Sequence, residues 1–138
     1  MTMHYAPGDP DIAARHGART DIVVVEDEPT LARNLARFLT RRGYKVAVAG
    51  TLARARELCR ALAPHIVLTD YNLPDGNGPT LTDELRATGF PCKVDIITAH
   101  GNAALADDAL RRGADRYLQK PVPFETLASI VGELEPTA

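Results

Sequence analysis

DIVVVED, Asp21 to Asp27, is the segment most indicative of the fold class, because an apolar run passes directly into acidic side chains. A short continuous run of valine and isoleucine predicts a strand buried on both faces, as in a parallel sheet. Three other segments follow the same plan, since HIVLTD ends at Asp70, VDIIT ends at Thr98 and RYLQ precedes Lys120. Open parallel sheets collect functional groups at the carboxyl ends of their strands, so we expect these side chains to meet in one crevice.

Length and composition predict one compact domain. The chain has 138 residues, 45% of them hydrophobic, which suffices for one sizeable core and leaves little room for a second. The formal net charge of -2 gives no broad attraction to nucleic acid or to anionic membranes. No stretch reaches the apolar length of a membrane span, and the first residues lack the plan of a signal peptide. We therefore expect a cytoplasmic protein that contacts neither DNA nor membrane directly.

Two cysteines, Cys59 and Cys92, are too few for a disulfide framework and lack zinc-ligand spacing. Both are predicted to be free thiols.

Strand-like and helical patterns alternate along the chain. Strands are expected at 21–25, 44–49, 66–69, 93–98 and 116–118, and helical stripes follow each of them, the last through Phe124 to Leu134. Thr51 and Asn102 are predicted to cap their helices, and the turn formers PDGNG from Pro74 are predicted to form a loop. Residues 1–20 are expected to be a poorly ordered arm, 21–135 the domain and 136–138 a tail.

Five strand–helix units with short connections require right-handed crossovers, hence an α/β three-layer sandwich with a parallel sheet. The natural choice is a flavodoxin-like (βα)5 fold with strand order 2-1-3-4-5. In that order the first and third strands are neighbours where the winding direction reverses, so Asp27 and Asp70 should face each other across a crevice. Thr98 and Lys120 would line its other wall.

Carboxylates gathered in a partly desolvated cleft repel one another unless a cation is bound or a proton is retained. Mg²⁺ suits such a site, because it prefers few carboxylates, several waters and a phosphate oxygen. Asp70 would then be a nucleophile toward phosphorus, as aspartyl phosphate chemistry requires. Lys120 would contribute a positive charge to the phosphoryl oxygens, and the Thr98 hydroxyl a hydrogen bond.

The four segments, in this order, resemble the signature segments of two-component response-regulator receiver domains of the chemotaxis-regulator-like kind. They read VVVEDEP from Val23, LTDYNLPDGNG from Leu68, IITAHG from Ile96 and RYLQKP from Arg116, and the resemblance extends from about Asp21 to Leu134. It implies that Asp70 is the phosphoacceptor and that Thr98 and Lys120 contact the phosphoryl group.

The resemblance also implies a magnesium site and a switch. The implied metal ligands are Glu26, Asp27, Asp70 and the backbone carbonyl of Asn72. Glu26 stands where aspartate is more frequent, and its longer arm suggests binding through water. The rotamer of Tyr117 would follow Thr98, the Lys120–Pro121 bond would be cis, and phosphorylation would alter the face formed by the fourth helix, fifth strand and fifth helix.

By the same resemblance, the phosphoryl group comes from a phosphohistidine on a sensor histidine kinase or a phosphotransfer protein, or from acetyl phosphate. The chain would be a self-catalysed phosphoacceptor switch that also dephosphorylates itself, rather than an ordinary enzyme, and His100 and Asn72 would tune the phosphoryl lifetime. The predicted contacts for a downstream target are Arg111, Arg112, Arg116 and Glu125. The chain is either a stand-alone receiver or the receiver of a transcription regulator or hybrid kinase.

Other interpretations account for fewer residues. A flavin-binding relative of this fold needs a hydroxyl- and glycine-rich loop after the first strand, whereas Glu26, Asp27 and Glu28 would repel a phosphate. An aspartyl phosphatase needs a second acid two residues after its nucleophile, where this chain has Asn72. A receiver-like module that is never phosphorylated usually lacks an acid, the threonine or the lysine. Each residue alone has an ordinary explanation, and the functional interpretation depends on their coincidence at one sheet edge.

Overall fold

The structure is a computed structural model, and it describes residues 20–99 and 101–133. Most of the predicted arm, the predicted tail, His100 and Leu134 lie outside this part of the chain. Thr20, which we assigned to the arm, is instead buried, and its N–H donates a hydrogen bond of 3.0 Å to the Leu62 carbonyl. Among the described residues, no helix combines the length and the apolar content of a membrane span.

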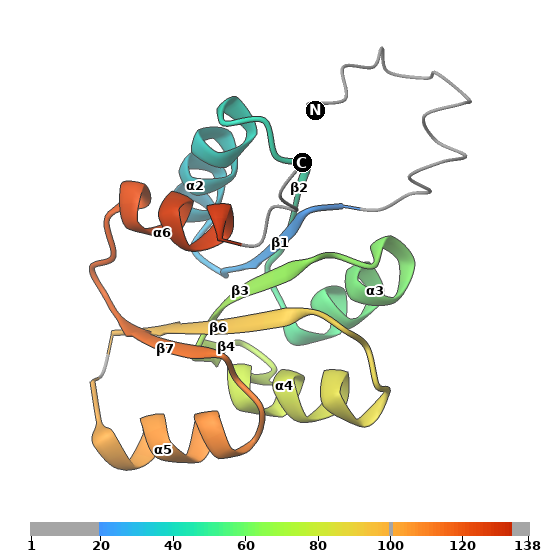
Figure 1. The fold of residues 1–138 in the computed structure, drawn as a ribbon, viewed down its shortest axis with the longest axis vertical. Helices are drawn as coiled ribbons and strands as arrows, with labels where there is room; N and C mark the ends of the chain where they lie inside the picture. The colour runs from blue at the N-terminus through green and yellow to red at the C-terminus, as the bar shows by residue number, and fades with distance from the viewer. Residues whose placement is uncertain (1–19, 100, 134–138) are drawn as a thin grey trace.

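The predicted parallel sheet is confirmed, with the order β2-β1-β3-β6-β7 (Figure 1). Its strands are β1 (Ile22–Val25), β2 (Val46–Ala49), β3 (Ile66–Asp70), β6 (Lys93–Thr98) and β7 (Arg116–Gln119). This is the predicted order 2-1-3-4-5, and it makes β1 and β3 neighbours.

Helices cover both faces of the sheet, as the three-layer prediction requires (Figure 1). They are α2 (Pro29–Arg41), α3 (Leu52–Leu62), α4 (Gly78–Ala87), α5 (Ala103–Arg111) and α6 (Phe124–Gly132). Helices α2 and α6 lie over one face, and α3, α4 and α5 lie over the other.

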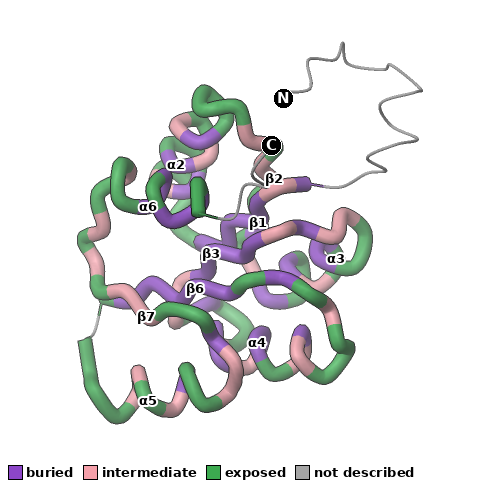
Figure 2. The backbone as a smooth tube through the Cα atoms, in the orientation of Figure 1, coloured by how far each residue is buried: buried purple, intermediate pink, exposed green. Residues whose placement is uncertain are grey.

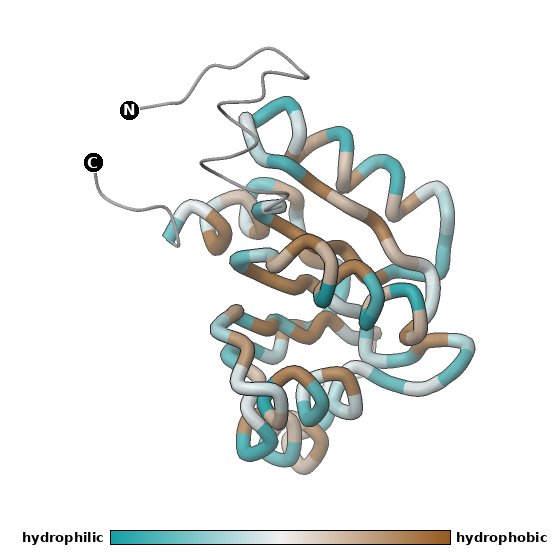
Figure 3. The backbone as a smooth tube through the Cα atoms, turned by 90° about the vertical axis from the view of Figure 1, so that its right-hand side faces the viewer, coloured by the Kyte–Doolittle hydropathy of each residue, from teal (hydrophilic) through white to brown (hydrophobic). Residues whose placement is uncertain are grey.

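Each face of the sheet has its own hydrophobic core. Along β1, Ile22 and Val24 pack toward α2 and α6, while Val23 and Val25 pack toward the opposite helices. The central strands are therefore buried on both sides, whereas the outer turns of the helices are exposed (Figure 2). Apolar segments gather in this interior layer, and polar and apolar residues alternate along the helices (Figure 3). This explains why the strands appear in the sequence as continuous apolar runs.

Two predicted helix caps are present. The Thr51 hydroxyl accepts a hydrogen bond of 3.1 Å from the Arg54 N–H, and Asn102 Oδ1 accepts bonds of 2.8 and 3.1 Å from the N–H groups of Ala104 and Leu105. These bonds satisfy N–H groups that a helix leaves without an internal partner.

The PDGNG segment is more structured than the predicted loop. Its residues Gly76–Asn77 form β5, which pairs antiparallel with β4 (Asn72–Leu73) just before the segment, so the two make a short hairpin. The Asp75 carboxylate accepts hydrogen bonds from the N–H groups of Leu52 and Ala53 at 2.7 and 3.0 Å, and these bonds lower its pKa. A Cβ atom at Gly76 would lie 2.7 Å from Leu52 Cδ2, so a larger residue at this position would displace the buried Leu52 side chain of α3.

Cys59 and Cys92 are free thiols, as predicted, and both are buried. Burial raises the pKa of the Cys59 thiol to about 12, which keeps it in the unreactive thiol form.

Candidate functional site

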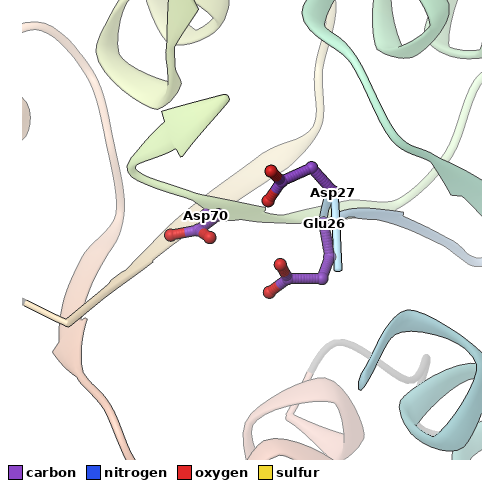
Figure 4. Close-up of side chains that lie close together, drawn as sticks. All are labelled: Glu26, Asp27 and Asp70. Atoms are coloured by element: carbon purple, nitrogen blue, oxygen red, sulfur yellow. The ribbon is translucent and has the colours of Figure 1, made fainter. Parts of the chain in front are cut away.

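Three carboxylates converge at the carboxyl end of the sheet. Glu26 and Asp27 follow β1, and Asp70 ends β3, whose Thr69 pairs in register with Val25 of β1. One oxygen of each carboxylate lies within 4.8 Å of the other two, and Figure 4 shows Glu26 and Asp27 directed toward Asp70. The predicted meeting of Asp27 and Asp70 across the crevice is confirmed.

The three acids differ in their surroundings. Glu26 is 8% exposed, Asp70 is half-buried, and Asp27 is exposed. Burial raises the pKa of the Glu26 carboxyl, and the neighbouring charge of Asp70 adds to this, whereas hydrogen bonds from the Glu28 N–H and from Lys120 oppose it. Ionised carboxylates so close together repel one another, and a bound cation would offset this repulsion.

Lys120 is the cation already present among these acids. Its Nζ donates hydrogen bonds of 3.1 Å to Glu26 Oε1 and 3.2 Å to Asp70 Oδ2. The Lys120 N–H is bonded at 2.7 Å to the Thr98 carbonyl, and the Lys120–Pro121 bond is cis, as predicted. Partial burial alone would lower the pKa of Lys120, but its bonds to Glu26 and Asp70 outweigh burial and raise it. Lys120 therefore stays charged beside the predicted phosphoacceptor.

Thr98 and Tyr117 lie together on neighbouring strands. Thr98 ends β6 and is 2% exposed, and its side chain is hydrogen-bonded to the Tyr117 phenol. Burial raises the pKa of Tyr117, and the bond to Thr98 opposes this. The Tyr117 ring meets the Tyr71 ring edge-on, with centroids 6.2 Å apart. The two predicted switch residues are therefore in direct contact. Thr98 directly follows Ile97, which pairs in register with Asp70, so the contact lies next to the predicted phosphoacceptor.

Asn72, the remaining predicted metal ligand, lies in β4 opposite Asn77 and is exposed. It follows Asp70 by two residues, so it lies at the same edge of the sheet. Its role as a carbonyl ligand stays a prediction.

Glu28 has a role beside the site that the sequence did not predict. Its carboxylate caps α2 by accepting bonds of 3.1 and 2.7 Å from the N–H groups of Thr30 and Leu31, and its own N–H donates to Glu26 Oε2 at 3.1 Å. Because Glu28 caps α2, the Asp27 carboxylate remains in the acid cluster. The sequence contains a signal for this cap. Proline is favoured in the first turn of a helix, so Pro29 marks the start of α2 and the acidic residue before it is at the capping position.

Most charges predicted as downstream contacts are engaged within the chain. Arg112 pairs with Asp83 at 2.6 Å and Asp108 at 3.0 Å. Arg116 contacts Glu133, and Glu125 pairs with Arg42 at 2.8 Å. Arg111 alone of the four has no ion pair among the residues that the structure describes.

The donor set fits a hard divalent cation. Carboxylate and carbonyl oxygens are the ligands that Mg²⁺ prefers, and three carboxylate oxygens already lie close enough to share one ion. Beside them, Asp70 offers a nucleophilic oxygen and Lys120 a fixed positive charge. This combination suits binding and transfer of a phosphoryl group.

Comparisons with known proteins point to one family. The response regulator receiver domain profile matches residues 22–132. The transcriptional regulatory protein TorR of the torCAD operon from Escherichia coli K12 is 37% identical over 115 residues, which cover 82% of this chain and 49% of TorR. The photosynthetic apparatus regulatory protein RegA from Cereibacter sphaeroides is 30% identical over 111 residues, covering 80% of this chain and 60% of RegA.

A solved structure agrees with these relatives. A response regulator protein from Burkholderia pseudomallei, crystallised with a phosphorylated aspartic acid, a calcium ion and citrate, has a TM-score of 0.74 and 31% identity. The match covers 84% of this chain and 66% of that one. The chain spans about half to three fifths of the length of the two curated relatives.

Proposed function

The chain belongs to the response regulator receiver domain family, and from this premise we propose that Asp70 is its phosphoacceptor. Receiver domains of two-component systems are phosphoacceptor switches that interact with histidine kinases or phosphotransfer proteins and bind Mg²⁺ at an acidic pocket. The proposal assigns these properties to particular residues of this chain.

In the proposed transfer, an Asp70 carboxylate oxygen attacks the phosphorus of a phosphohistidine. The new O–P bond forms as the P–N bond breaks, and the imidazole leaves with the electron pair of that bond. Lys120, bonded to Asp70 at 3.2 Å, lies where it can shift its hydrogen bonds to the phosphoryl oxygens. The same geometry serves a small donor such as acetyl phosphate, so the chain itself would supply the catalytic groups.

Glu26, Asp27, Asp70 and the Asn72 carbonyl would hold the metal. Bound Mg²⁺ supplies positive charge that offsets the charge of the acids and of the phosphoryl oxygens. Glu26 has one oxygen on Lys120 and the other on the Glu28 N–H, which supports binding through water rather than directly. Hydrolysis of the acyl phosphate by water returns Asp70 to its free form, with Asn72 and His100 as the proposed influences on its rate.

We assign the switch to Thr98 and Tyr117. A phosphoryl group on Asp70 would draw the Thr98 hydroxyl away from the Tyr117 phenol, its present partner. Tyr117 then loses a hydrogen bond and can change rotamer, which alters the face of α5, β7 and α6. A downstream protein that distinguishes the two forms of this face would receive the signal. The protein would act in the cytoplasm, alone or joined to an output domain.

The observation that carries the proposal is the convergence of three carboxylates and Lys120 at the end of β1 and β3. It is tested by intact-mass measurement after incubation with acetyl phosphate and Mg²⁺. The native chain should gain one phosphoryl group, and this gain should vanish when a chelator removes Mg²⁺ or when Asp70 is changed to Asn. Equal labelling of the native chain and Asp70→Asn would remove Asp70 from the proposed role.

A further inference from the structure

A cavity of about 510 Å³ lies at the edge of the sheet opposite the acid cluster. Its lining includes the first residues of three strands, which are Ile66 of β3, Lys93 of β6 and Arg116 of β7. Ile130 of α6 and Glu133, directly after that helix, also line it. The acid cluster lies instead where β1 and β3 end, so the cavity is separate from the proposed phosphorylation site.

Asp95 of β6 lines this cavity with a buried oxygen that has no donor. Its side chain is 1% exposed, and Oδ2 accepts no hydrogen bond within residues 20–99 and 101–133. Arg116 Nε lies 3.9 Å from Oδ2, which is beyond hydrogen-bond distance, and the Arg116 guanidinium is bonded to Glu133. A buried acceptor without a donor costs free energy, so a donor at this position would be favourable.

The other charged groups of the lining form ion pairs with one another. Lys93 Nζ lies 3.7 Å from Asp115 Oδ1, and Arg116 contacts Glu133. Asp95 is the third acid of the lining against these two bases, so its carboxylate is the least compensated charge there. A ligand that satisfies Asp95 must therefore donate a hydrogen bond, and a positive charge on that ligand would strengthen the bond.

An organic cation matches the cavity better than a metal ion does. In the part of the chain that the structure describes, the acids grouped tightly enough to share an ion are Glu26, Asp27 and Asp70, and Asp95 is not one of them. The buried side chains of Ile66 and Ile130 give the cavity apolar walls, along which a hydrocarbon stem can pack. An ammonium group on a short stem meets both requirements.

We propose that this cavity binds a small primary amine in its protonated form, with the ammonium group hydrogen-bonded to Asp95 Oδ2 and the stem against Ile66 and Ile130. The Glu133 side chain is 57% exposed and lies at the rim, where the second ammonium group of a diamine can pair with it. The inference goes beyond the proposed function, because none of these residues belongs to the phosphorylation site.

The titration of Asp95 gives the proposed site a pH signature. The charged groups around Asp95 are Lys93 of the same strand, Asp115 and Arg116 at the start of β7, and Glu133 after α6. Burial raises the pKa of Asp95 to about 6, and an ammonium ion prefers the carboxylate to the neutral acid. The carboxylate is about a tenth of Asp95 at pH 5 and almost all of it at pH 7.5, while alkylammonium groups stay protonated. Affinity for the amine should therefore rise with pH.

The test is an NMR titration of the full chain with 1,4-diaminobutane, in which the amide signals of Arg116 and Ile130 report binding at the cavity. Asp95→Asn keeps the shape of the side chain and removes its charge. Asp107→Asn, at an exposed position of α5, is the matched control because it removes the same charge. The fully N-methylated diamine is the matched probe, because it keeps both positive charges and has no N–H group to donate.

We expect the native chain and Asp107→Asn to bind the diamine with similar affinity, and Asp95→Asn to bind it at least about 10-fold more weakly, because a charged acceptor is lost. The methylated diamine should bind the native chain at least about 10-fold more weakly, because the donor is lost. The native affinity should fall about 10-fold from pH 7.5 to pH 5. Circular dichroism reports whether each variant is folded, and the methylated probe and the pH dependence of the native chain decide the question without any variant.

Several results would overturn the proposal. One is a native titration in which the signals of Arg116 and Ile130 do not move, or in which signals move at the acid cluster alone. Another is equal affinity of Asp95→Asn and Asp107→Asn for the diamine. The same holds for equal affinity of the native chain for the two diamines, or for an affinity that does not change with pH. None of these results depends on whether Asp70 accepts a phosphoryl group.

Discussion

Asp95 is a buried acid within β6, and its titration should be visible in the stability of the whole domain. It is 1% exposed, and its Oδ2 has no hydrogen-bond partner among the described residues. Its register partner Arg116 places Nε 3.9 Å away. The charged groups around this position are Lys93, Asp115, Arg116 and Glu133, which line a shared cavity with Asp95. Burial raises the pKa of Asp95 from 3.8 to about 6, although Arg116 opposes the rise.

The sign of the effect follows from the raised pKa. The folded chain binds the Asp95 proton more tightly than the unfolded chain, so stability is gained as pH falls through about 6 and lost as pH rises through it. A tenfold change in proton affinity is worth about 1.4 kcal/mol. The free energy of unfolding should therefore be about 1.4 kcal/mol larger at pH 5 than at pH 7.5, from Asp95 alone, with a limit of about 3 kcal/mol at lower pH.

The assay is urea unfolding of the native chain and of Asp95→Asn across this pH range. Asp95→Asn keeps the shape of the side chain and removes its titration, so the pH-dependent difference between the two proteins isolates Asp95. Asp107→Asn, at an exposed position of α5, is the control and should leave the native pH dependence in place. Parallel pH profiles for the native chain and Asp95→Asn would show that Asp95 does not contribute to the pH dependence of stability.

Three further predictions concern the acid cluster and its supports. Asp27→Asn should weaken Mg²⁺ binding in calorimetry by at least about 10-fold, because it removes one anionic ligand; an unchanged affinity would place the ion elsewhere. Lys120→Gln should slow labelling by acetyl phosphate on the order of 10²-fold, because it removes the positive charge that would contact the phosphoryl oxygens, and it should not weaken Mg²⁺ binding, because every carboxylate of the cluster remains; native labelling rates would exclude that role. Glu28→Ala should lower the free energy of unfolding by about 1 kcal/mol in urea titrations, because two N–H groups of α2 lose their acceptor; no loss would mean that water replaces the cap fully.

The sheet and its reactive edge could be predicted from the sequence because both depend on local patterns. Short apolar runs identified the strands, and connection handedness left few strand orders. Once β1 and β3 were neighbours, Asp27 and Asp70 had to share an edge. Thr51 and Asn102 were recognisable as caps because their residue types directly precede helical stripes.

What the sequence left open depends on contacts between distant segments. The PDGNG hairpin is held against α3 through Asp75, and nothing local to the segment indicates that partner. Asp95 belongs to a strand that we treated as an apolar run, and the pattern could not show that its carboxyl lies near Arg116. Arg112 appeared free for a partner, but Asp83 of α4 is its ion-pair partner across the helix layer.

Chemical trapping can show whether the acyl phosphate forms on Asp70 itself. After labelling with acetyl phosphate and Mg²⁺, borohydride reduction converts a phosphorylated aspartate to homoserine, and tandem mass spectrometry locates the product. Homoserine at position 70 and at no other acid is the predicted result. Homoserine at position 27, or a phosphoryl group retained on a histidine with Asp70 unmodified, would exclude Asp70 as the phosphoacceptor.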